Sequence, residues 1–286
     1  MENTDKIVPV GAIIGDTMGS TFEGKSEVEE GYELIRGNCC FTDDSVMTIA
    51  ILKAVREYKK NKGLDLKDLA IYYMQKLGRR YLWAGYGQMF MRWLFTDEPE
   101  PYGSFGNGAA MRVSPCGWYA DSFTEALYMA ELVTEVTHNH PDAIKGAKAV
   151  AGWIYLARQG WDKKAIFDRL MQEGLYEPSE DIERGKFDIT CKGTVNIAIH
   201  SVMNCNSFEE ILRDAISYGG DTDTNACIAC SMAEPLYDIP ANLKEYVINR
   251  LRYKRSDGLE EVMLYNLLYD MDNDYEKQIL DKGDRG

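Results

Sequence analysis

The stretch FTDDSVMTIA (residues 41–50) places two adjacent aspartates, Asp43 and Asp44, at the head of an apolar segment. Apolar residues recur at helical spacing as far as Tyr58, and Gly63 suits a stop, so the segment predicts a helix. Neighbouring carboxylates repel one another, and a helix start needs only one capping side chain. Two explanations for the adjacent aspartates are therefore open: one of them caps the helix, or both bind a cation.

Helical spacing continues along the rest of the chain. Capping residues precede further apolar stretches, namely Asp65, Ser122 with Glu125, Pro141, Asp162, and Ser207 with Glu210. Alternating strand patterns are almost absent, and no long Pro/Gly/Ser linker divides the chain. We therefore predict one compact all-α domain over residues 1–271, followed by a loosely held polar tail over 272–286.

The bulk composition is that of a globular protein, with 45% hydrophobic and 27% charged residues. No apolar run is long enough to span a bilayer, and the start MENTDK lacks the regions of a signal peptide, so we expect a cytoplasmic protein without a membrane partner. The net charge of −14 disfavours nucleic acid as a partner. Seven scattered cysteines indicate reduced thiols, and Cys227 and Cys230 are expected to be buried helix residues.

A second acidic turn occurs in YGGDTDTNA (218–226), where Asp221, Asp223 and Thr224 lead into another helix. Each residue, taken singly, is most simply an N-cap. Two carboxylates plus hydroxyls at each of two helix starts exceed that requirement, and Mg²⁺ takes oxygen ligands. If the two turns face one another, they could hold two ions roughly 4 Å apart. From the residues alone, a metal site and coincident caps both stay open.

Two glycine-rich stretches offer further candidates. In VGAIIGDTMGSTFEG (10–24), glycines four residues apart predict close helix packing, while Asp16 and Glu23 remain candidates for chemistry. In PYGSFGNGAAMR (101–112), three glycines around Asn107 can visit left-handed backbone angles and could aim N–H groups at a phosphate. The spacing matches neither the P-loop nor the Rossmann fingerprint, so an ordinary loop is the alternative.

The three histidines carry little signal. His138 in THNHPD lies between two predicted helices, where lining a pocket and packing at a helix junction are equally consistent with the residues. For His140 and His200 we expect capping or packing.

Together, and in this order, the four stretches resemble the motifs of the ADP-ribosylglycohydrolase family, which includes the dinitrogenase reductase-activating enzymes and the ADP-ribosyl-acceptor hydrolases. The resemblance runs from about residue 10 to about residue 235. It implies a compact orthogonal helical bundle and a binuclear magnesium centre in which manganese can substitute.

The resemblance also implies roles for individual residues. The metal ligands would be Thr42, Asp43, Asp44, Asp221, Asp223 and Thr224. Glu23 falls on the acidic residue of the family's mobile flap, and Asp16 on a supporting aspartate. The loop that holds a diphosphate would comprise Gly103, Ser104, Phe105, Gly106, Asn107 and Gly108, with His138 lining the ADP-ribose pocket.

Two departures from the family pattern stand out. Phe105 occupies a position where members often have tyrosine, so stacking could persist while a hydroxyl contact is lost. Pro235 falls where members continue in small apolar residues, and because proline costs about 3 kcal/mol in a helix interior, we expect the helix to kink or end near Glu234.

The resulting hypothesis is Mg²⁺-dependent hydrolysis of the bond between the anomeric carbon of ADP-ribose and a protein side chain. Glu23 would transfer the proton, and Asp43 and Asp44 would complete the catalytic centre. The partner is then an ADP-ribosylated protein or ADP-ribose itself. An ADP-ribose-binding or immunity protein that counters a transferase without turnover is the main alternative, and a metal phosphohydrolase acting on nucleotides is another.

Overall fold

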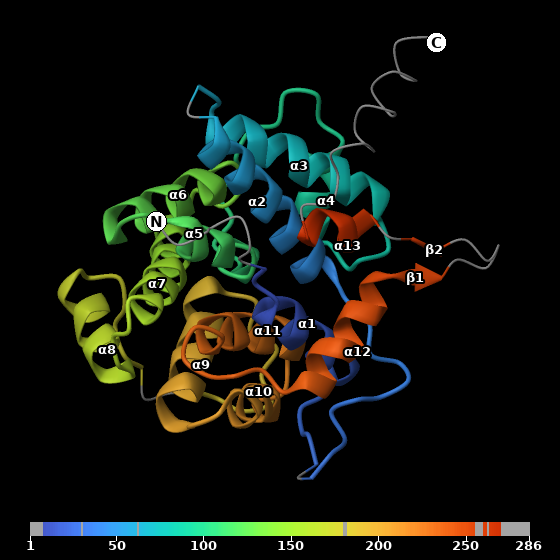
Figure 1. The fold of residues 1–286 in the computed structure, drawn as a ribbon, viewed down its shortest axis with the longest axis vertical. Coiled ribbons are helices and arrows are strands. Elements are labelled where there is room, and N and C mark those ends of the chain that lie inside the picture. The colour runs from blue at the N-terminus through green and yellow to red at the C-terminus, as the bar shows by residue number, and fades with distance from the viewer. Residues whose placement is uncertain are drawn as a thin grey trace.

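The computed structural model describes residues 8–29, 31–61, 63–179, 182–254, 260–261 and 263–269 (Figure 1). The predicted tail over 272–286 lies outside these residues. The helices, in chain order, are α1 (Gly11–Gly19), η2 (Ser20–Phe22), α2 (Asp43–Lys60), α3 (Leu66–Arg80), α4 (Gln88–Leu94), η3 (Asn107–Ala109), α5 (Ser114–Tyr119), α6 (Phe123–Glu135), α7 (Pro141–Arg158), α8 (Lys163–Gln172), α9 (Cys191–Asn204), α10 (Phe208–Ser217), α11 (Thr222–Ala233), α12 (Ala241–Leu251) and α13 (Met263–Leu268).

A two-stranded antiparallel sheet is the one sheet within the described residues, and no sequence pattern predicted it. Strands β1 (Tyr253–Lys254) and β2 (Glu260–Glu261) pair in the register Tyr253 to Glu261 and Lys254 to Glu260. The rest of the described architecture is helical, which confirms the all-α prediction.

Helices α1 and α11 lie at the centre of the molecule (Figure 1), and every residue of both is buried. They run antiparallel with their backbones in contact: a Cβ placed on Gly15 would lie 2.1 Å from the carbonyl oxygen of Ala226. Gly11 and Gly19 meet the backbone of α11 in the same way. The predicted close packing of the glycine stretch is therefore confirmed, and α11 is its partner.

The predicted helix ends follow local sequence closely. The hydroxyl oxygen of Ser122 accepts the Glu125 N–H (3.1 Å), and Ser207 does the same for Glu210 (3.2 Å). The two glutamates bond one residue earlier than a capping box predicts, at the N–H groups of Asp121 and Asn206. Asp65 and Asp162 also cap their helices, Pro141 is the first residue of α7, and α11 ends at Ala233, just before Pro235.

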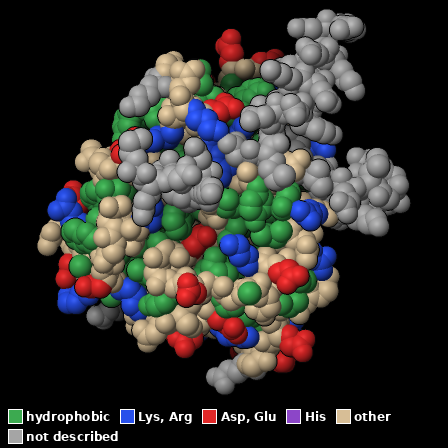
Figure 2. Space-filling model, in the orientation of Figure 1, with side chains coloured by type: hydrophobic (Ala, Val, Ile, Leu, Met, Phe, Trp, Pro, Cys, Tyr) green, Lys and Arg blue, Asp and Glu red, His purple; other side chains and the backbone are tan. Residues whose placement is uncertain are grey.

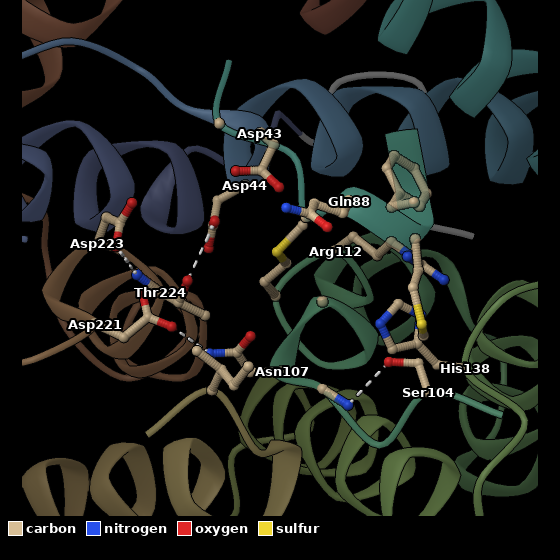
Figure 3. Close-up of a pocket in the computed structure, with 18 of the residues that line it drawn as sticks. Asp43, Asp44, Gln88, Ser104, Asn107, Arg112, His138, Asp221, Asp223 and Thr224 are labelled. Carbon is tan, nitrogen blue, oxygen red and sulfur yellow. Dashed lines mark hydrogen bonds between the residues drawn. The ribbon is translucent and has the colours of Figure 1, made fainter. Parts of the chain in front are cut away.

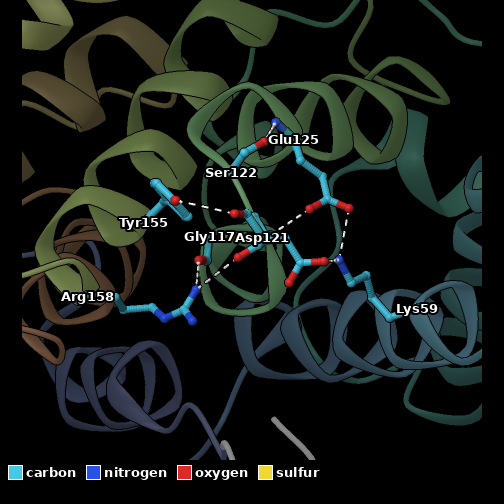
Figure 4. Close-up of polar contacts among 8 residues, drawn as sticks. Lys59, Gly117, Asp121, Ser122, Glu125, Tyr155 and Arg158 are labelled. Atoms are coloured by element: carbon cyan, nitrogen blue, oxygen red, sulfur yellow. Dashed lines mark hydrogen bonds and ion pairs between the residues drawn. The ribbon is translucent and has the colours of Figure 1, made fainter. Parts of the chain in front are cut away.

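Polar contacts join the helices that surround the centre (Figure 4). Near the end of α2, the Lys59 ammonium lies 2.7 Å from the Asp121 carboxylate and 2.9 Å from that of Glu125. From the end of α7, Arg158 donates to the carbonyl oxygen of Gly117 (2.8 Å). These contacts connect α2, α5, α6 and α7 at the periphery, so the core helices keep fixed neighbours.

The cysteines and the surface fit the composition. All seven cysteines are free thiols, and Cys227 and Cys230 are buried in α11, as predicted. Acidic and basic side chains are interspersed on the face shown in Figure 2. Within the described ranges, no helix combines the length and apolar character that a membrane crossing needs.

Candidate active site

A cavity of about 480 Å³ opens between the starts of α2 and α11 and the glycine-rich loop before α5. One wall is acidic and comprises Glu23, Asp43, Asp44, Asp221, Asp223 and Thr224. The opposite side includes Ser104, Gly106, Asn107, Gly108, Arg112 and His138. In Figure 3 the aspartates of α2 face those of α11 across a short gap, and His138 lies at the far side.

The start of α2 is held by Asp16, which lies on the central helix α1 and is fully buried. Its carboxylate accepts the Thr42 N–H (2.9 Å) and hydroxyl (2.7 Å), and also the Ser45 N–H (3.0 Å) and hydroxyl. Burial raises the pKa of Asp16 to about 6, while these hydrogen bonds oppose that rise. Asp16 therefore fixes where α2 begins relative to α1.

Side-chain capping does not account for the acidic residues of the two turns. Thr42 is the N-cap of α2 and accepts the Asp44 N–H (3.4 Å), so Asp43 and Asp44 lie inside the first turn. Asp221 holds the N-cap position of α11, but its carboxylate makes no capping hydrogen bond. The explanation by coincident caps is therefore wrong for these three carboxylates.

The carboxylates instead converge on one another. Oxygen atoms of Asp16, Asp44 and Asp223 lie within 4.8 Å of one another, and so do those of Glu23, Asp221 and Asp223. One oxygen of Asp44 accepts the Thr224 hydroxyl (3.3 Å), whereas its other oxygen, Oδ1, is buried without a hydrogen-bond partner among the described residues. A buried carboxylate oxygen without a partner is costly, and a cation would satisfy it.

The electrostatics of the cluster agree with its geometry. Burial, and then repulsion from Asp16, raise the pKa of Asp43 to about 8. The pKa values of Asp44 and Asp223 are raised well above the ordinary value for the same reasons, burial first and neighbouring aspartates second. Such a cluster either takes up protons near neutral pH or is balanced by a positive ion. Hard oxygen donors of this kind fit a divalent cation such as Mg²⁺.

Glu23 lies at the mouth of the cavity, directly after η2 and exposed to solvent. Its loop is pinned to the α10–α11 turn, because the Gly24 N–H donates to Gly220 O (2.8 Å) and the Gly220 N–H donates to Lys25 O (2.8 Å). Partial burial, and then the charge of Asp221, raise the pKa of Glu23. A carboxyl group with a raised pKa at this place suits proton transfer.

The glycine-rich loop 103–108 uses its glycines in more than one way. Of its three glycines only Gly103 has a positive φ (+71°). Gly108 is needed for space instead, because a Cβ there would lie 3.1 Å from His138 Nε2, whereas one on Gly106 would lie at an ordinary contact distance of 3.7 Å from it. The loop therefore uses the left-handed angles open to its glycines at one position, and Gly108 serves where a side chain would be crowded.

Several loop N–H groups already have protein acceptors. Those of Gly103, Gly106 and Asn107 donate to Asn139 Oδ1, Ser104 Oγ and Ile189 O. Within the described part of the chain, the N–H groups of Ser104 and Phe105 have no such acceptor. An anion bound at this loop would therefore find fewer free backbone N–H donors than the loop has residues.

Asn107 connects the loop to the acidic wall. Its amide nitrogen donates to Asp221 Oδ2 (2.6 Å) and to the Thr194 hydroxyl (3.1 Å). The side chain is nearly buried. A ligand held at the loop would therefore lie at a fixed distance from the carboxylates.

His138 is buried on the loop side, and its Nδ1 lies 2.7 Å from the Thr137 hydroxyl. Burial, and then the charge of Arg112, lower the pKa of His138 well below its ordinary value. The other two histidines lie elsewhere. His140 caps α7 by accepting the Asp142 N–H (3.2 Å), and His200 contacts the Tyr218 hydroxyl (2.6 Å).

Not every predicted site residue lines the cavity. Thr42 points to Asp16, the Gly103 N–H is used by Asn139, and Phe105 is half exposed with its ring 5.7 Å from that of His140. The cavity also has lining residues that sequence reasoning did not identify, among them Gln88, Tyr102, Arg112, Phe187 and Ile189. Of these residues, Arg112 could have been identified from the sequence, because it ends the stretch PYGSFGNGAAMR as its single basic residue.

Comparisons with known proteins agree with these observations. A family model described as ADP-ribosylglycohydrolase matches residues 8–274. The chain is 26% identical over 264 residues to the ADP-ribosyl-[dinitrogen reductase] glycohydrolase of Rhodospirillum rubrum, with 81% of this chain and 86% of that protein covered. It is 27% identical to the ADP-ribosylhydrolase ARH3 of Gallus gallus, with 79% and 83% covered. A solved structure described as an ADP-ribosylglycohydrolase-related protein complex matches with a TM-score of 0.65 and 22% identity, covering 95% of this chain and 99% of that one, which shows a shared fold.

Proposed function

Because this chain belongs to the ADP-ribosylglycohydrolase family, we propose that it removes ADP-ribose from modified protein side chains in a reaction that depends on Mg²⁺. Membership in the family makes it a hydrolase that releases ADP-ribose. The dependence on metal, the protein substrate and the roles of individual residues are the proposed parts.

The observation that carries the proposal is the convergence of carboxylates from two helix starts at one end of the cavity. Asp44 from α2 and Asp223 from α11 bring oxygens within 4.8 Å of one another, and Oδ1 of Asp44 lacks a partner among the described residues. We propose that Asp43, Asp44, Asp221, Asp223 and Thr224, which line the cavity, hold two Mg²⁺ ions, which Mn²⁺ can replace. Thr42 completes the proposed ligand set through a hydroxyl oxygen whose own proton is donated to Asp16. When bound, the ions would supply positive charge that orients a sugar diol and makes water more acidic.

The placement of the substrate is proposed from what lies opposite the carboxylates. ADP-ribose carries a diphosphate between two ribose groups, and we place that diphosphate at the loop 103–108, beside Gly106 and Gly108. Asn107 then sets the distance from the loop to Asp221 (2.6 Å from its amide nitrogen). With the diphosphate held there, the terminal ribose would extend toward the acidic wall, and its anomeric carbon would lie in reach of Glu23.

Glu23 is the group we propose for proton transfer. It lies at the cavity mouth, where the acceptor side chain of a modified protein would enter, and its raised pKa favours a carboxyl group that can give up a proton to the leaving group. As the leaving group takes that proton, the anomeric carbon would gain oxocarbenium character, and water would add to it to complete the hydrolysis.

The decisive experiment incubates the protein with arginine-linked and serine-linked ADP-ribosylated peptides in Mg²⁺ and identifies the product by mass spectrometry. We expect free ADP-ribose and an unmodified peptide, and no release in EDTA. The Asp43→Asn and Asp223→Asn variants should lose release while keeping the helical circular dichroism spectrum. Asp168→Asn is the matched control, because Asp168 pairs with Lys164 on the surface of α8.

Three results would contradict the proposal. Undiminished release in EDTA, or full activity of Asp43→Asn and Asp223→Asn, would remove the metal from the reaction. AMP or phosphate as the product would indicate a phosphohydrolase.

A further inference from the structure

Arg112 is a buried cation beside the cavity whose charge has no carboxylate partner among the described residues. It is 1% exposed, and its Nη2 donates to the Thr137 hydroxyl oxygen (2.7 Å) and the Val133 carbonyl oxygen (3.2 Å). Burial lowers the pKa of Arg112 to about 10, so the guanidinium stays charged at neutral pH. A buried charge is costly, and its position next to His138 calls for an explanation.

The Thr137 hydroxyl links Arg112 to His138. A guanidinium only donates hydrogen bonds, so Thr137 Oγ1 must accept from Arg112, and its single proton must go elsewhere. Two acceptors are in reach, His138 Nδ1 at 2.7 Å and Thr134 O at 3.5 Å. The Thr134 carbonyl already accepts the N–H groups of His138 (2.9 Å) and Thr137 (3.2 Å). The Thr137 proton therefore points to His138 Nδ1.

This direction of the hydrogen bond determines the state of the His138 ring. If Nδ1 accepts, the proton of a neutral imidazole lies on Nε2. In a protonated ring, Nδ1 would carry a proton that points at Thr137 Oγ1, which already accepts from Arg112. The charged imidazolium would also lie beside the charged guanidinium of Arg112. Among the described residues, the ionisable groups next to the ring are Arg112 and Tyr102, so no carboxylate offsets such a charge.

His138 Nε2 lies beside the glycine loop. It would be 3.1 Å from a Cβ on Gly108 and 3.7 Å from one on Gly106, and it makes no hydrogen bond within the described residues. The ring also lines the cavity, so an Nε2–H can reach a ligand bound there. A side chain on Gly108 would crowd this nitrogen.

The geometry points to a positioning role for Arg112 and Thr137: they hold His138 as a neutral ring with its proton on Nε2, which donates a hydrogen bond to an oxygen of the ligand at loop 103–108. The ligand contact rests on the proposed function, whereas the protonation state of the free protein does not. Arg112 also lines the cavity, but its role here is exerted through Thr137. Its donation to Oγ1 occupies one of the two lone pairs of the hydroxyl and leaves the hydroxyl proton for His138.

The first test measures the ring directly by ¹⁵N NMR of the imidazole nitrogens in the full-length, ligand-free protein. The chain has three histidines, so the spectrum of His138→Gln assigns the His138 signals by their loss. We expect one neutral ring with the proton on Nε2, unchanged between about pH 8 and about pH 5.5, where an ordinary histidine of pKa near 6.5 titrates. A proton on Nδ1, or a ring that becomes charged in this range, would overturn the inference.

The second test uses variants at Thr137 and ADP-ribose as the probe. Thr137→Val keeps the shape and removes the hydroxyl, so we expect the Nε2–H signature to be lost and the dissociation constant for ADP-ribose to rise about tenfold. Thr137→Ser restores the hydroxyl and should restore both. If Thr137→Val does not fold, the NMR result on the wild type decides alone.

The two tests separate this inference from the proposed function. A wild type that binds no ADP-ribose but shows the Nε2–H ring would contradict the function and leave the protonation state standing. Tight binding with the proton on Nδ1 would contradict this inference only. If Thr137→Val binds as tightly as the wild type while its ring changes, the ligand contact of His138 is wrong.

Discussion

At the scale of single residues, the two oxygens of Asp44 have different surroundings. Oδ2 accepts the Thr224 hydroxyl, and Oδ1 is buried without a partner among the described residues. An unpaired buried acceptor costs roughly 1–3 kcal/mol, so such an arrangement persists when it serves a ligand. We expect this oxygen to be the one that most depends on a cation.

At Glu23, the effect of a substitution on the rate of ADP-ribose release can be separated from its effect on ADP-ribose binding. Glu23→Gln removes the proton but keeps the size of the side chain, so we expect kcat for release of ADP-ribose to fall about 10²- to 10⁴-fold. The dissociation constant for ADP-ribose should change little, because the loop and His138 are untouched. Single-turnover release and calorimetric binding measure the two quantities.

The matched control is Glu27→Gln, an exposed glutamate in the same loop, which should leave both quantities unchanged. A Glu23→Gln variant with wild-type kcat would assign the proton transfer to another group. Protection against a transferase that persists in this variant without turnover would support a binding protein instead.

At the scale of elements, the contact between α1 and α11 is the most restrictive one. A Cβ on Gly15 would lie 2.1 Å from Ala226 O, closer than any real contact, so Gly15→Ala must push the two helices apart. We expect a loss of roughly 1–3 kcal/mol or more in the free energy of unfolding, which exceeds the gain in helix propensity. Mg²⁺ affinity should fall as well, because α11 carries Asp221 and Asp223.

Urea unfolding and calorimetric titration of Mg²⁺ check both expectations. Gly37→Ala is the control, since nothing lies within 4 Å of a Cβ at that position and its φ is ordinary. Equal stability of the two variants would mean that the helices can separate without cost.

Helix ends and buried glycines were predictable because they depend on neighbours in the chain. Ser122, Ser207 and Pro235 act within a few residues, and the structure confirms their effects. The glycine spacing specified a flat helix face but not its partner, since α11 lies some two hundred residues away in the chain.

The site was less predictable than the fold. The two acidic turns do face one cavity, but Asp16 was assigned no clear role. The hydrogen bonds that its carboxylate accepts from four donor groups of Thr42 and Ser45 exist only after α1 and α2 pack. Phe187 and Ile189 lie on an irregular segment without periodicity, so no sequence pattern indicated that they line the cavity.

At the scale of the whole molecule, the carboxylate cluster makes stability depend on pH and on metal. A carboxyl group whose pKa is higher in the folded chain than in the unfolded chain stabilises the fold at low pH, and this contribution is lost as the pH rises through the folded value. For Asp43 the pKa rises from 3.8 to about 8, and for Asp16 from 3.8 to about 6. The metal-free protein should therefore lose stability between about pH 4 and about pH 8.

Mg²⁺ should reverse that loss by balancing the ionised carboxylates, so the difference in Tm between Mg²⁺ and EDTA should be larger at about pH 8 than at about pH 5. Differential scanning calorimetry measures it. In Asp43→Asn the difference should shrink at the higher pH. A difference that is equal at both pH values would show that the cluster does not bind the ion in the way described.

Helix α1 contributes none of the proposed ion ligands, yet it sets the gap between them. It contacts the start of α2 through hydrogen bonds to the short side chain of Asp16, and it contacts α11 through glycines, which have no side chain. Helix α1 thus sets the distance between the two acidic turns, and the side chains through which it does so have almost no rotatable bonds. Surface loops and outer helices can then differ in sequence without changing the distance between the two acidic turns.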